Sequence, residues 1–380
     1  MTLNEKQELI ERYYIQMEDD LLLNISKKLS QGKPMEIVID ETTKILDWQL
    51  QRLKDFDALN EENIKIIAKY SKLTEKEVRE VFEMAKEVGS TADKTVLDKG
   101  IKLGVLKEID GNLARITYDN IMSNAIDEVL TTFNSQNNSL LRSASKGYEE
   151  IVNKVTSEAL AGTKTLGNAM EEAVTELSKK GLTGFTARNG AEWTPEAYTK
   201  MVIRSNVKNT INKVSEERFK LAGNDYIEIN AYSGARPKCS IDQGKVYSLS
   251  GNTEPITDIK GNKIKVYAWG NSTYGEPDGI LGINCGHSRH AFVPNVSIYR
   301  EKKIDKKEND ELYMENQQQR LYERTIRNKK REIEMQKQIN ASKDYIDKLN
   351  KKLRDYKNEY NDFLKETGRY RNYSNEWIGK

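Results

Sequence analysis

The sequence has very few cysteine and histidine residues, and it lacks long apolar runs and phosphate-binding glycine loops. Of its 380 residues only two are cysteine and two are histidine. No run of about 18 apolar residues is present, which excludes a transmembrane helix. The N-terminus lacks the apolar core and cleavage site of a signal peptide, so we expect a protein that is made in the cytoplasm, where thiols stay reduced. Phosphate-binding glycine loops are also missing.

The composition favours long, solvent-exposed helices over one large spherical core. Hydrophobic residues make up only 37% of the chain, and charged residues make up 32%. The 23 glycines and 6 prolines are too few for a disordered, low-complexity protein. A chain of 380 residues is long enough for several domains.

Charge is nearly balanced, with a formal net charge of +2. Residues 300–380 hold 22 Lys/Arg against 16 Asp/Glu, a net of +6, so the rest of the chain carries −4. A dedicated DNA-binding domain shows a much denser, one-sided basic charge. Contact of this mildly basic tail with DNA is therefore an alternative and not the leading interpretation.

All the cysteines and histidines lie in one turn-rich stretch, as Cys239, Cys285, His287 and His290. Thiolate and imidazole are the best zinc ligands among side chains, and a tetrahedral site needs four ligands. The spacing Cys-x45-Cys-x-His-x2-His requires the fold to bring Cys239 to the other three. The sequence therefore predicts a zinc site formed by these four residues.

Three other interpretations of the same residues stay open. Cys239 and Cys285 could form a disulfide, which a reducing compartment disfavours. The cysteines could be buried as small hydrophobes, with His287 bonded to a backbone partner. A Cys–His dyad for nucleophilic catalysis would need an orienting group, for which Asp242 and Asn284 are the nearby candidates.

Helical periodicity dominates the first half of the chain, which we divide into an N-terminal helical region, residues 1–100, and a second helical region, residues 101–224. The chain is expected to break at the Gly-Lys-Pro of residues 32–34. The first helix should bury one apolar stripe, formed by Leu9, Ile10, Tyr13, Tyr14 and Met17. The second should bury another, formed by Leu46, Leu50 and Leu53.

Two local patterns predict where helices begin. Thr74, followed three residues later by Glu77, has the form of a capping box. Thr194 is a good N-cap, and Pro195 after it suits the first helical position, where its missing N–H costs nothing.

The periodicity changes at Asp225, and residues 225–296 are predicted to form a small β-rich Cys/His module. Residues 226–232 alternate between apolar and polar, and residues 245–247 and 263–267 are two more candidate strands. The Lys-Gly-Asn-Lys of residues 260–263 predicts a tight hairpin turn.

The last region, residues 297–380, is predicted to be a charged helical tail. It contains one seam with alternating spacings of three and four residues: Ile346, Leu349, Leu353, Tyr356, Tyr360 and Phe363. The seam either packs back on its own protein or forms a coiled coil with another chain. The predicted fold class is thus α+β, with a long helical region, the Cys/His module and a coiled-coil-like tail.

The module and its flanks resemble the phage minor capsid protein 2 family, which are head proteins of tailed phages and prophages related to the Mu-type head-morphogenesis proteins. Four stretches carry the resemblance: Thr-Pro-Glu-x-Tyr-x2-Met-Val-Ile-Arg at 194–204, Ser-Gly-Ala-Arg-Pro-x-Cys at 233–239, Gln-Gly-Lys-Val-Tyr-Ser at 243–248, and Gly-x-Asn-Cys-x-His-Ser at 282–288 with Phe-x-Pro at 292–294. The charged tail is similar as well, and the likeness covers about residues 190–370.

The resemblance implies a structural head protein with no enzymatic activity, located in the virion at the portal vertex and capsid interior. The partners it implies are the portal protein and the capsid or scaffold proteins, with weak contact to packaged DNA. The role it implies is in head assembly or in DNA packaging and ejection. The alternatives are a zinc- or cysteine-dependent enzyme delivered with the genome, and an internal DNA-contacting protein.

Three residues depart from the family's pattern. Tyr232 stands where a histidine is expected, Gly286 where arginine is common, and His290 where an aromatic is usual. The resemblance therefore assigns a shared metal role to Cys239, Cys285 and His287 rather than to His290.

Overall fold

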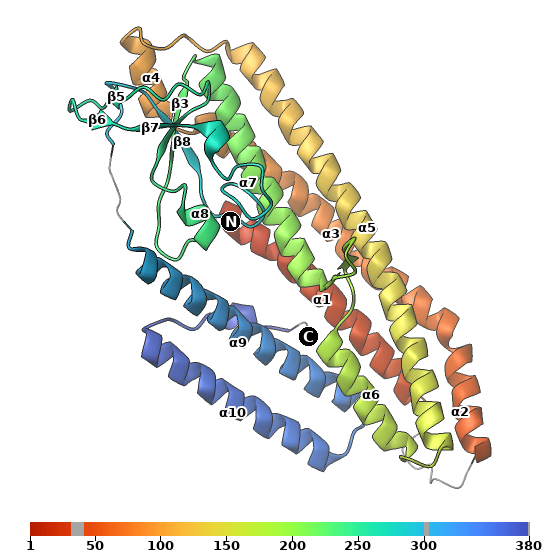
Figure 1. The fold of residues 1–380 in the computed structure, drawn as a ribbon. Helices are drawn as coiled ribbons and strands as arrows, with labels where there is room; N and C mark the ends of the chain where they lie inside the picture. The colour runs from red at the N-terminus through yellow and green to blue at the C-terminus, as the bar shows by residue number, and fades with distance from the viewer. Residues whose placement is uncertain (32–41, 300–303, 379–380) are drawn as a thin grey trace. The chain divides into compact units, whose positions relative to one another are not determined.

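The fold is α+β, with long helices and one small sheet as its main elements (Figure 1). The computed structural model describes residues 1–31, 42–299 and 304–378, so the break expected at residues 32–34 lies outside the described residues. The helices are α1 Leu3–Ser30, α2 Thr42–Lys54, α3 Phe56–Thr91, α4 Lys94–Lys102, α5 Gly111–Leu160, α6 Leu166–Lys180, α7 Pro195–Leu221, α8 Pro237–Ser240, α9 Lys306–Gln338 and α10 Lys343–Thr367.

The chain forms two compact units, each assembled from separated segments. The sheet unit consists of Met1–Gln7, Glu77–Thr131 and Lys200–Gln317. The helical unit consists of Glu8–Lys76, Thr132–Thr199 and Gln318–Lys380. The boundaries fall inside α1, α3, α5, α7 and α9, because long helices contribute residues to both units. The four consecutive regions expected from the sequence follow changes in residue pattern, and their standing as domains stays a prediction.

The strands of the main sheet follow the change in periodicity at Asp225. The main sheet has the order β7-β4-β3-β8, with β3 Tyr226–Ile229, β4 Val246–Ser248, β7 Val266–Ala268 and β8 Arg289–Phe292. Strand β3 is antiparallel to both β4 and β8, and β7 runs parallel to β4. Two small hairpins are separate from this sheet: β5–β6 (Ile256–Thr257 and Lys263–Ile264) in the sheet unit, and β1–β2 (Phe185–Thr186 and Glu192–Trp193) in the helical unit. The expected main sheet in residues 225–296 is confirmed.

One of the two predicted helix starts is right. Helix α7 begins at Pro195, and the hydroxyl of Thr194 accepts a hydrogen bond from the backbone N–H of Ala197 at 3.3 Å. The other is wrong, because Thr74 lies inside the continuous helix α3. A capping box acts only where the chain before it leaves the helix, and the preceding residues of α3 are already helical.

The apolar face predicted for α2 is also wrong. Leu46, Leu50 and Leu53 are 42%, 56% and 42% exposed. The residues that α2 buries are Ile45, Trp48 and Arg52. The Arg52 guanidinium donates to the carbonyl oxygen of Lys28 at 2.5 Å, so a charged residue occupies the core-facing side. A prediction based only on leucine positions missed this face. The indole of Trp48 and the paired guanidinium of Arg52 can each bury more surface than a leucine side chain.

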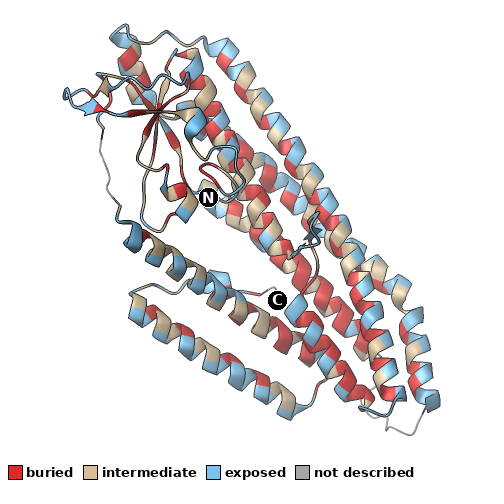
Figure 2. Cartoon of the chain, viewed as in Figure 1, coloured by how far each residue is buried: buried red, intermediate tan, exposed pale blue. Residues whose placement is uncertain are grey.

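The helical unit is built on α1, α5 and α6 (Figure 2). Helix α1 is buried on more than one side, since Tyr14 and Ile15, and Met17 to Asp19, are consecutive buried residues. The predicted stripe of α1 is confirmed, with Ile10, Tyr14 and Met17 fully buried. A buried ion cluster lies in the same unit. Arg331 of α9 donates to Asp19 at 2.5 Å and to Glu18 at 2.9 Å. The Glu18 carboxylate also accepts the backbone N–H of Leu182 at 2.9 Å.

The predicted seam of the tail lies on one face of α10, and this face packs against α9. Leu349, Leu353 and Tyr360 are buried there together with Ile326 and Ile333 of α9. Aromatic rings extend the contact, with Tyr322 stacked on Tyr360 at a centroid distance of 5.1 Å. The continuous helix over residues 346–363 is confirmed. A coiled coil with another chain stays a prediction.

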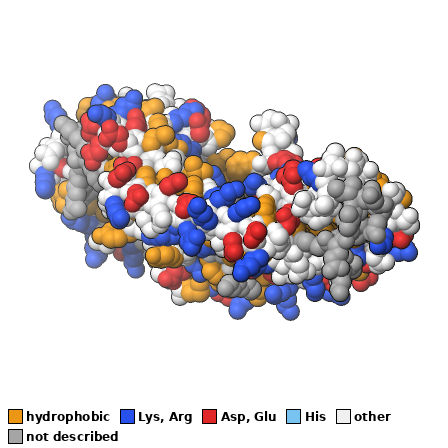
Figure 3. Space-filling model, turned by 90° about the horizontal axis from the view of Figure 1, so that it is seen from below, with side chains coloured by type: hydrophobic (Ala, Val, Ile, Leu, Met, Phe, Trp, Pro, Cys, Tyr) orange, Lys and Arg blue, Asp and Glu red, His pale blue; other side chains and the backbone are white. Residues whose placement is uncertain are grey.

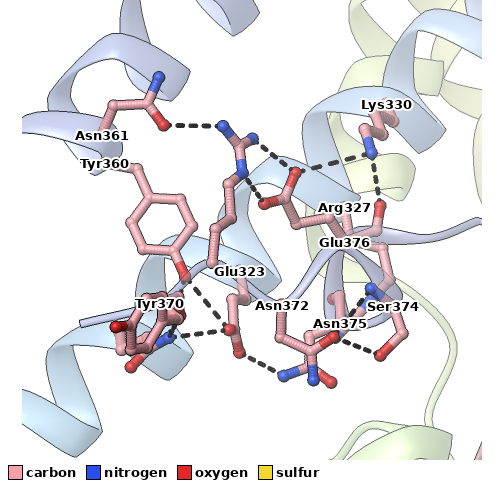
Figure 4. Close-up of polar contacts among 12 residues, drawn as sticks. Glu323, Arg327, Lys330, Tyr360, Asn361, Tyr370, Asn372, Ser374, Asn375 and Glu376 are labelled. Carbon is pink, nitrogen blue, oxygen red and sulfur yellow. Dashed lines mark hydrogen bonds and ion pairs between the residues drawn. The ribbon is translucent and has the colours of Figure 1, made fainter. Parts of the chain in front are cut away.

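A short segment after α10 is fastened back to the helix pair (Figure 4). The buried carboxylate of Glu376 accepts two hydrogen bonds from Arg371, at 2.5 and 2.8 Å, and lies 3.9 Å from the amine of Lys330. The side-chain amide of Asn375 donates to Glu323 at 2.8 Å. The segment around residues 371–376 is therefore part of the folded tail.

Among the helices in the described ranges, none combines the length and apolarity needed to cross a membrane.

Candidate functional site

The sheet explains how Cys239 reaches the other chemically distinctive residues. Ile229 at the end of β3 lies opposite Arg289 at the start of β8. The loop that leaves β3 and the loop that enters β8 therefore begin at the same end of the sheet. Cys239 lies in the first loop, and Cys285 and His287 lie in the second. Strand pairing thus closes the 45-residue gap in the sequence.

Cys239 is held on the single-turn helix α8. Pro237 occupies the first helical position, and Cys239 is only 1% exposed. Its Sγ atom lies 3.3 Å from the carbonyl oxygen of Gly279. The preceding loop is anchored by Asn309 of α9, whose side chain accepts from the N–H of Ala235 at 2.9 Å and donates to its carbonyl at 2.8 Å. These contacts fix the position of the first thiol.

Cys285 lies in a tight loop in which Leu281 and Asn284 both have a φ of +57°. The backbone N–H of Leu281 donates to the Cys285 Sγ atom at 3.2 Å. That sulfur lies 3.8 Å from the Sγ atom of Cys239 and 3.3 Å from Nδ1 of His287. The expected approach of the two sulfurs, with His287 beside them, is confirmed.

His287 is fully buried and held on two sides. Its ring stacks on the ring of Tyr232 with a centroid distance of 4.5 Å and an interplanar angle of 23°. Its Nε2 atom lies 3.1 Å from the side-chain oxygen of Gln243. That same oxygen accepts the backbone N–H of Tyr232 at 3.1 Å. Because the oxygen is an acceptor for both, Nε2 carries a proton, and Nδ1 is the ring nitrogen that faces the Cys285 sulfur.

His290 does not join the other three residues. It lies within β8 opposite Glu228, and its Nδ1 atom is 3.2 Å from a carboxylate oxygen of Asp93. Its side chain is 49% exposed, whereas His287 is buried. Successive residues of an extended chain point to opposite sides, so two histidines three positions apart face different ways. The ligand atoms that come together within 4.8 Å are those of Cys239, Cys285 and His287.

The residue that orients His287 is one that the sequence analysis missed. The two candidates were Asp242 and Asn284. The carboxylate of Asp242 instead accepts from the hydroxyl of Tyr247 at 2.6 Å, and the N–H of Asn284 donates to Ser205 at 3.1 Å. Gln243 takes the orienting role. It lies in the Gln-Gly-Lys-Val-Tyr stretch, whose tight turn at residue 244 has a φ of +74°, and this turn was the available signal.

The two thiols differ strongly in acidity. The hydrogen bond from Cys239, supported by those from His287, lowers the pKa of Cys285 to about 4. The same interaction and burial raise the pKa of Cys239. The half-buried amine of Lys208 donates to Ser288 at 2.5 Å, and burial lowers its pKa while nearby Cys285 opposes this. The cluster of Cys239, Cys285 and His287 is suited to three kinds of chemistry. It could bind a soft cation, its two thiols could oxidise to a disulfide, or Cys285 could act as a nucleophile.

Comparison with known proteins shows which family the chain belongs to. The model of the family described as phage minor capsid protein 2 matches residues 2–365. The chain belongs to this family. The resemblance seen in the module therefore extends over nearly the whole minor capsid protein, including both compact units.

Two relatives of this minor capsid protein are described as structural proteins of phages. That of Lactococcus phage LL-H is 27% identical over 355 residues, which is 91% of this chain and 90% of that protein. That of Lactococcus phage mv4 is 43% identical over 65 residues, which is 16% of this chain and 48% of that protein. No solved structure matches the chain. Both names describe a structural phage protein.

Proposed function

We propose that this protein is a minor head protein located at the portal vertex and capsid interior, and that it acts in head assembly or in DNA packaging and ejection. The family match over residues 2–365 carries the proposal, because it includes the helical unit as well as the Cys/His module. The LL-H relative supports it, since a protein described as structural aligns with 91% of the chain.

The mechanism we propose is binding without turnover. Long helices would dock on the portal protein and on capsid or scaffold proteins, and the Cys/His module would act as a rigid knob. The geometry of the module supports rigidity. His287 is fully buried under Tyr232 and fixed by Gln243, so its ring has little freedom to exchange protons with a substrate. The locked tail segment around Glu376 provides a second rigid element.

The alternative roles have weaker support. On the face shown in Figure 3, Lys/Arg side chains are interspersed with Asp/Glu, which differs from the one-sided basic surface of a DNA-binding domain. Contact with DNA would show as binding that weakens steeply with salt, because phosphate contacts release counterions. Hydrolysis by Cys285 would need an oxyanion site and access for substrate to a base that is buried.

The proposal is tested in purified phage particles. Quantitative mass spectrometry before and after DNA ejection should find the protein in low copy number in the heads, and chemical cross-linking should join it to the portal protein. Particles assembled without the protein should show a defect in head assembly or DNA content. Absence from purified heads, or cross-links confined to tail proteins, would contradict the proposal.

A further inference from the structure

The cluster in the module has the dimensions of a metal site. We propose that Cys239, Cys285 and His287 bind one zinc ion through their two Sγ atoms and the Nδ1 atom. In a tetrahedral site the zinc-to-sulfur and zinc-to-nitrogen bond lengths place two sulfurs about 3.8 Å apart and a sulfur and nitrogen about 3.6 Å apart. The corresponding distances here are 3.8 Å between the sulfurs and 3.3 Å from Cys285 to His287.

The surroundings of His287 prepare it as a ligand. A zinc-bound histidine usually donates its other ring N–H to an acceptor that fixes its tautomer and orientation. Gln243 has this position, and its oxygen cannot be replaced by its NH₂ group without leaving the N–H of Tyr232 facing a donor. Tyr232 stacks on the ring and holds it in plane. Nδ1 is therefore the ring nitrogen left for the metal, and it lies 3.3 Å from the Cys285 sulfur.

The surroundings of Cys285 suit a thiolate. The backbone N–H of Leu281 donates to Cys285, which compensates negative charge on that sulfur. Two thiolates and one neutral imidazole would balance the charge of a zinc ion. Within the described ranges no fourth Cys, His, Asp or Glu joins this group, so we assign the fourth position to a water molecule that enters beside the partly exposed Cys285.

The other two chemistries explain less of the geometry. A disulfide would join the sulfurs at about 2.05 Å and would make no use of the oriented His287. A Cys–His nucleophile would use His287 but has no role for the buried Cys239 sulfur, 3.8 Å from Cys285. Zinc uses all three ligand atoms and joins the loop after β3 to the loop before β8. The inference does not depend on where in the virion the protein resides.

The test measures metal in the full-length protein purified under reducing conditions. We expect about one zinc per chain by elemental mass spectrometry, and, after exchange with Co²⁺, an absorption spectrum with sulfur-to-cobalt charge transfer and tetrahedral d–d bands. Cys285→Ser and His287→Gln should each lose most of the zinc. His290→Gln is the matched control and should keep it, because its side chain lies outside the cluster.

Two further measurements guard against variants that fail to fold. Gln243→Leu keeps all three ligands and should weaken zinc affinity about 10- to 100-fold, as expected when the partner of a ligating histidine is removed. Blocking the two thiols of the wild-type protein should release its zinc in proportion to thiol modified. Folded wild-type protein that contains no zinc and takes up no Co²⁺ with thiolate absorption would overturn the proposal. So would a Cys239–Cys285 disulfide in protein purified without oxygen.

Discussion

Different interactions stabilise the tail helix pair and the Cys/His module, although both belong to the same polar chain. In the tail, α10 presents a periodic apolar seam to α9, and each helix turn repeats the same kind of contact. In the module the strands are only two to four residues long, and single side chains hold the loops. The comparison suggests that the tail tolerates change at most surface positions, whereas the module depends on a few residues that have no substitute.

The polar groups follow the same division. In the helical unit, charged side chains are buried as ion clusters, such as Arg331 with Glu18 and Asp19. In the module, the buried carboxylates of Asp242 and Asp258 instead accept hydrogen bonds from neutral donors, such as Tyr247 and Asn262. Arg289 is the exception there, because it pairs with Glu216. Variants in each region, and one change of pH, test whether the two regions differ in this way.

The largest effect is expected from removing the buried cation of the helical unit. Arg331→Met leaves the carboxylates of Glu18 and Asp19 buried without their guanidinium partner, which should cost about 3–5 kcal/mol of unfolding free energy. Urea denaturation measures the loss. Lys337→Met is the control, because Lys337 pairs with Glu334 on the surface and should change stability by less than about 0.5 kcal/mol. Equal losses in the two variants would show that the cluster does not hold the unit together.

The next effect concerns the seam. Leu353→Asp places a charge where the side chain is only 9% exposed and packed against α9, and should cost about 2–4 kcal/mol. Lys352→Asp on the exposed side of the same turn should be nearly neutral. Limited proteolysis of the tail and incorporation into heads both report the difference. If both variants stay protected and are incorporated equally, the seam is not what orders the tail.

A smaller effect tests how exactly the module is packed. A Cβ atom at Gly286 would lie 2.5 Å from the hydroxyl oxygen of Tyr232, so Gly286→Ala should cost about 1–3 kcal/mol. Tyr232 and Gly286 thus pack directly against each other. In a Tyr232→Phe background the oxygen is gone, and the alanine should cost less by at least about 1 kcal/mol. Additive losses in the double variant would rule out this coupling.

The smallest effect is the pH dependence at His290. The hydrogen bond with Asp93 raises the pKa of His290 above 6.5, with Glu228 adding to the rise and burial and Lys208 opposing it. A raised folded-state pKa stabilises the fold below the unfolded value, and this contribution is lost as pH rises through the folded-state pKa. Urea denaturation between about pH 6 and pH 8 should therefore show a slight loss in the wild type. The loss should be absent in His290→Gln. If the unfolding free energy of the variant falls with pH as steeply as that of the wild type, His290 is not the group responsible.

Part of the site could be predicted from the sequence. The grouping of Cys239, Cys285 and His287 follows from their segregation in one turn-rich stretch, and the structure brings these three together. The sequence did not identify Gln243 as the partner of His287, and the residue spacing alone did not separate His290 from the cluster, although the family resemblance did. Both features depend on which loops contact each other in the folded protein, and one amino-acid sequence does not directly show such contacts.

Local structure follows from the amino-acid sequence wherever one periodic pattern is long enough. The stripe of α1, the start of α7 at Pro195, the change to strands at Asp225 and the seam of α10 all follow from repeats or from a proline that only one backbone position accepts. Short signals failed, as Thr74 and the leucines of α2 show, because longer-range packing overrides a preference of about 1 kcal/mol. Only the tertiary structure decided the division into two units, the buried Arg331 cluster and the geometry of the three ligand atoms. Each of these joins residues from distant segments, and their energy exists only when the whole chain has folded.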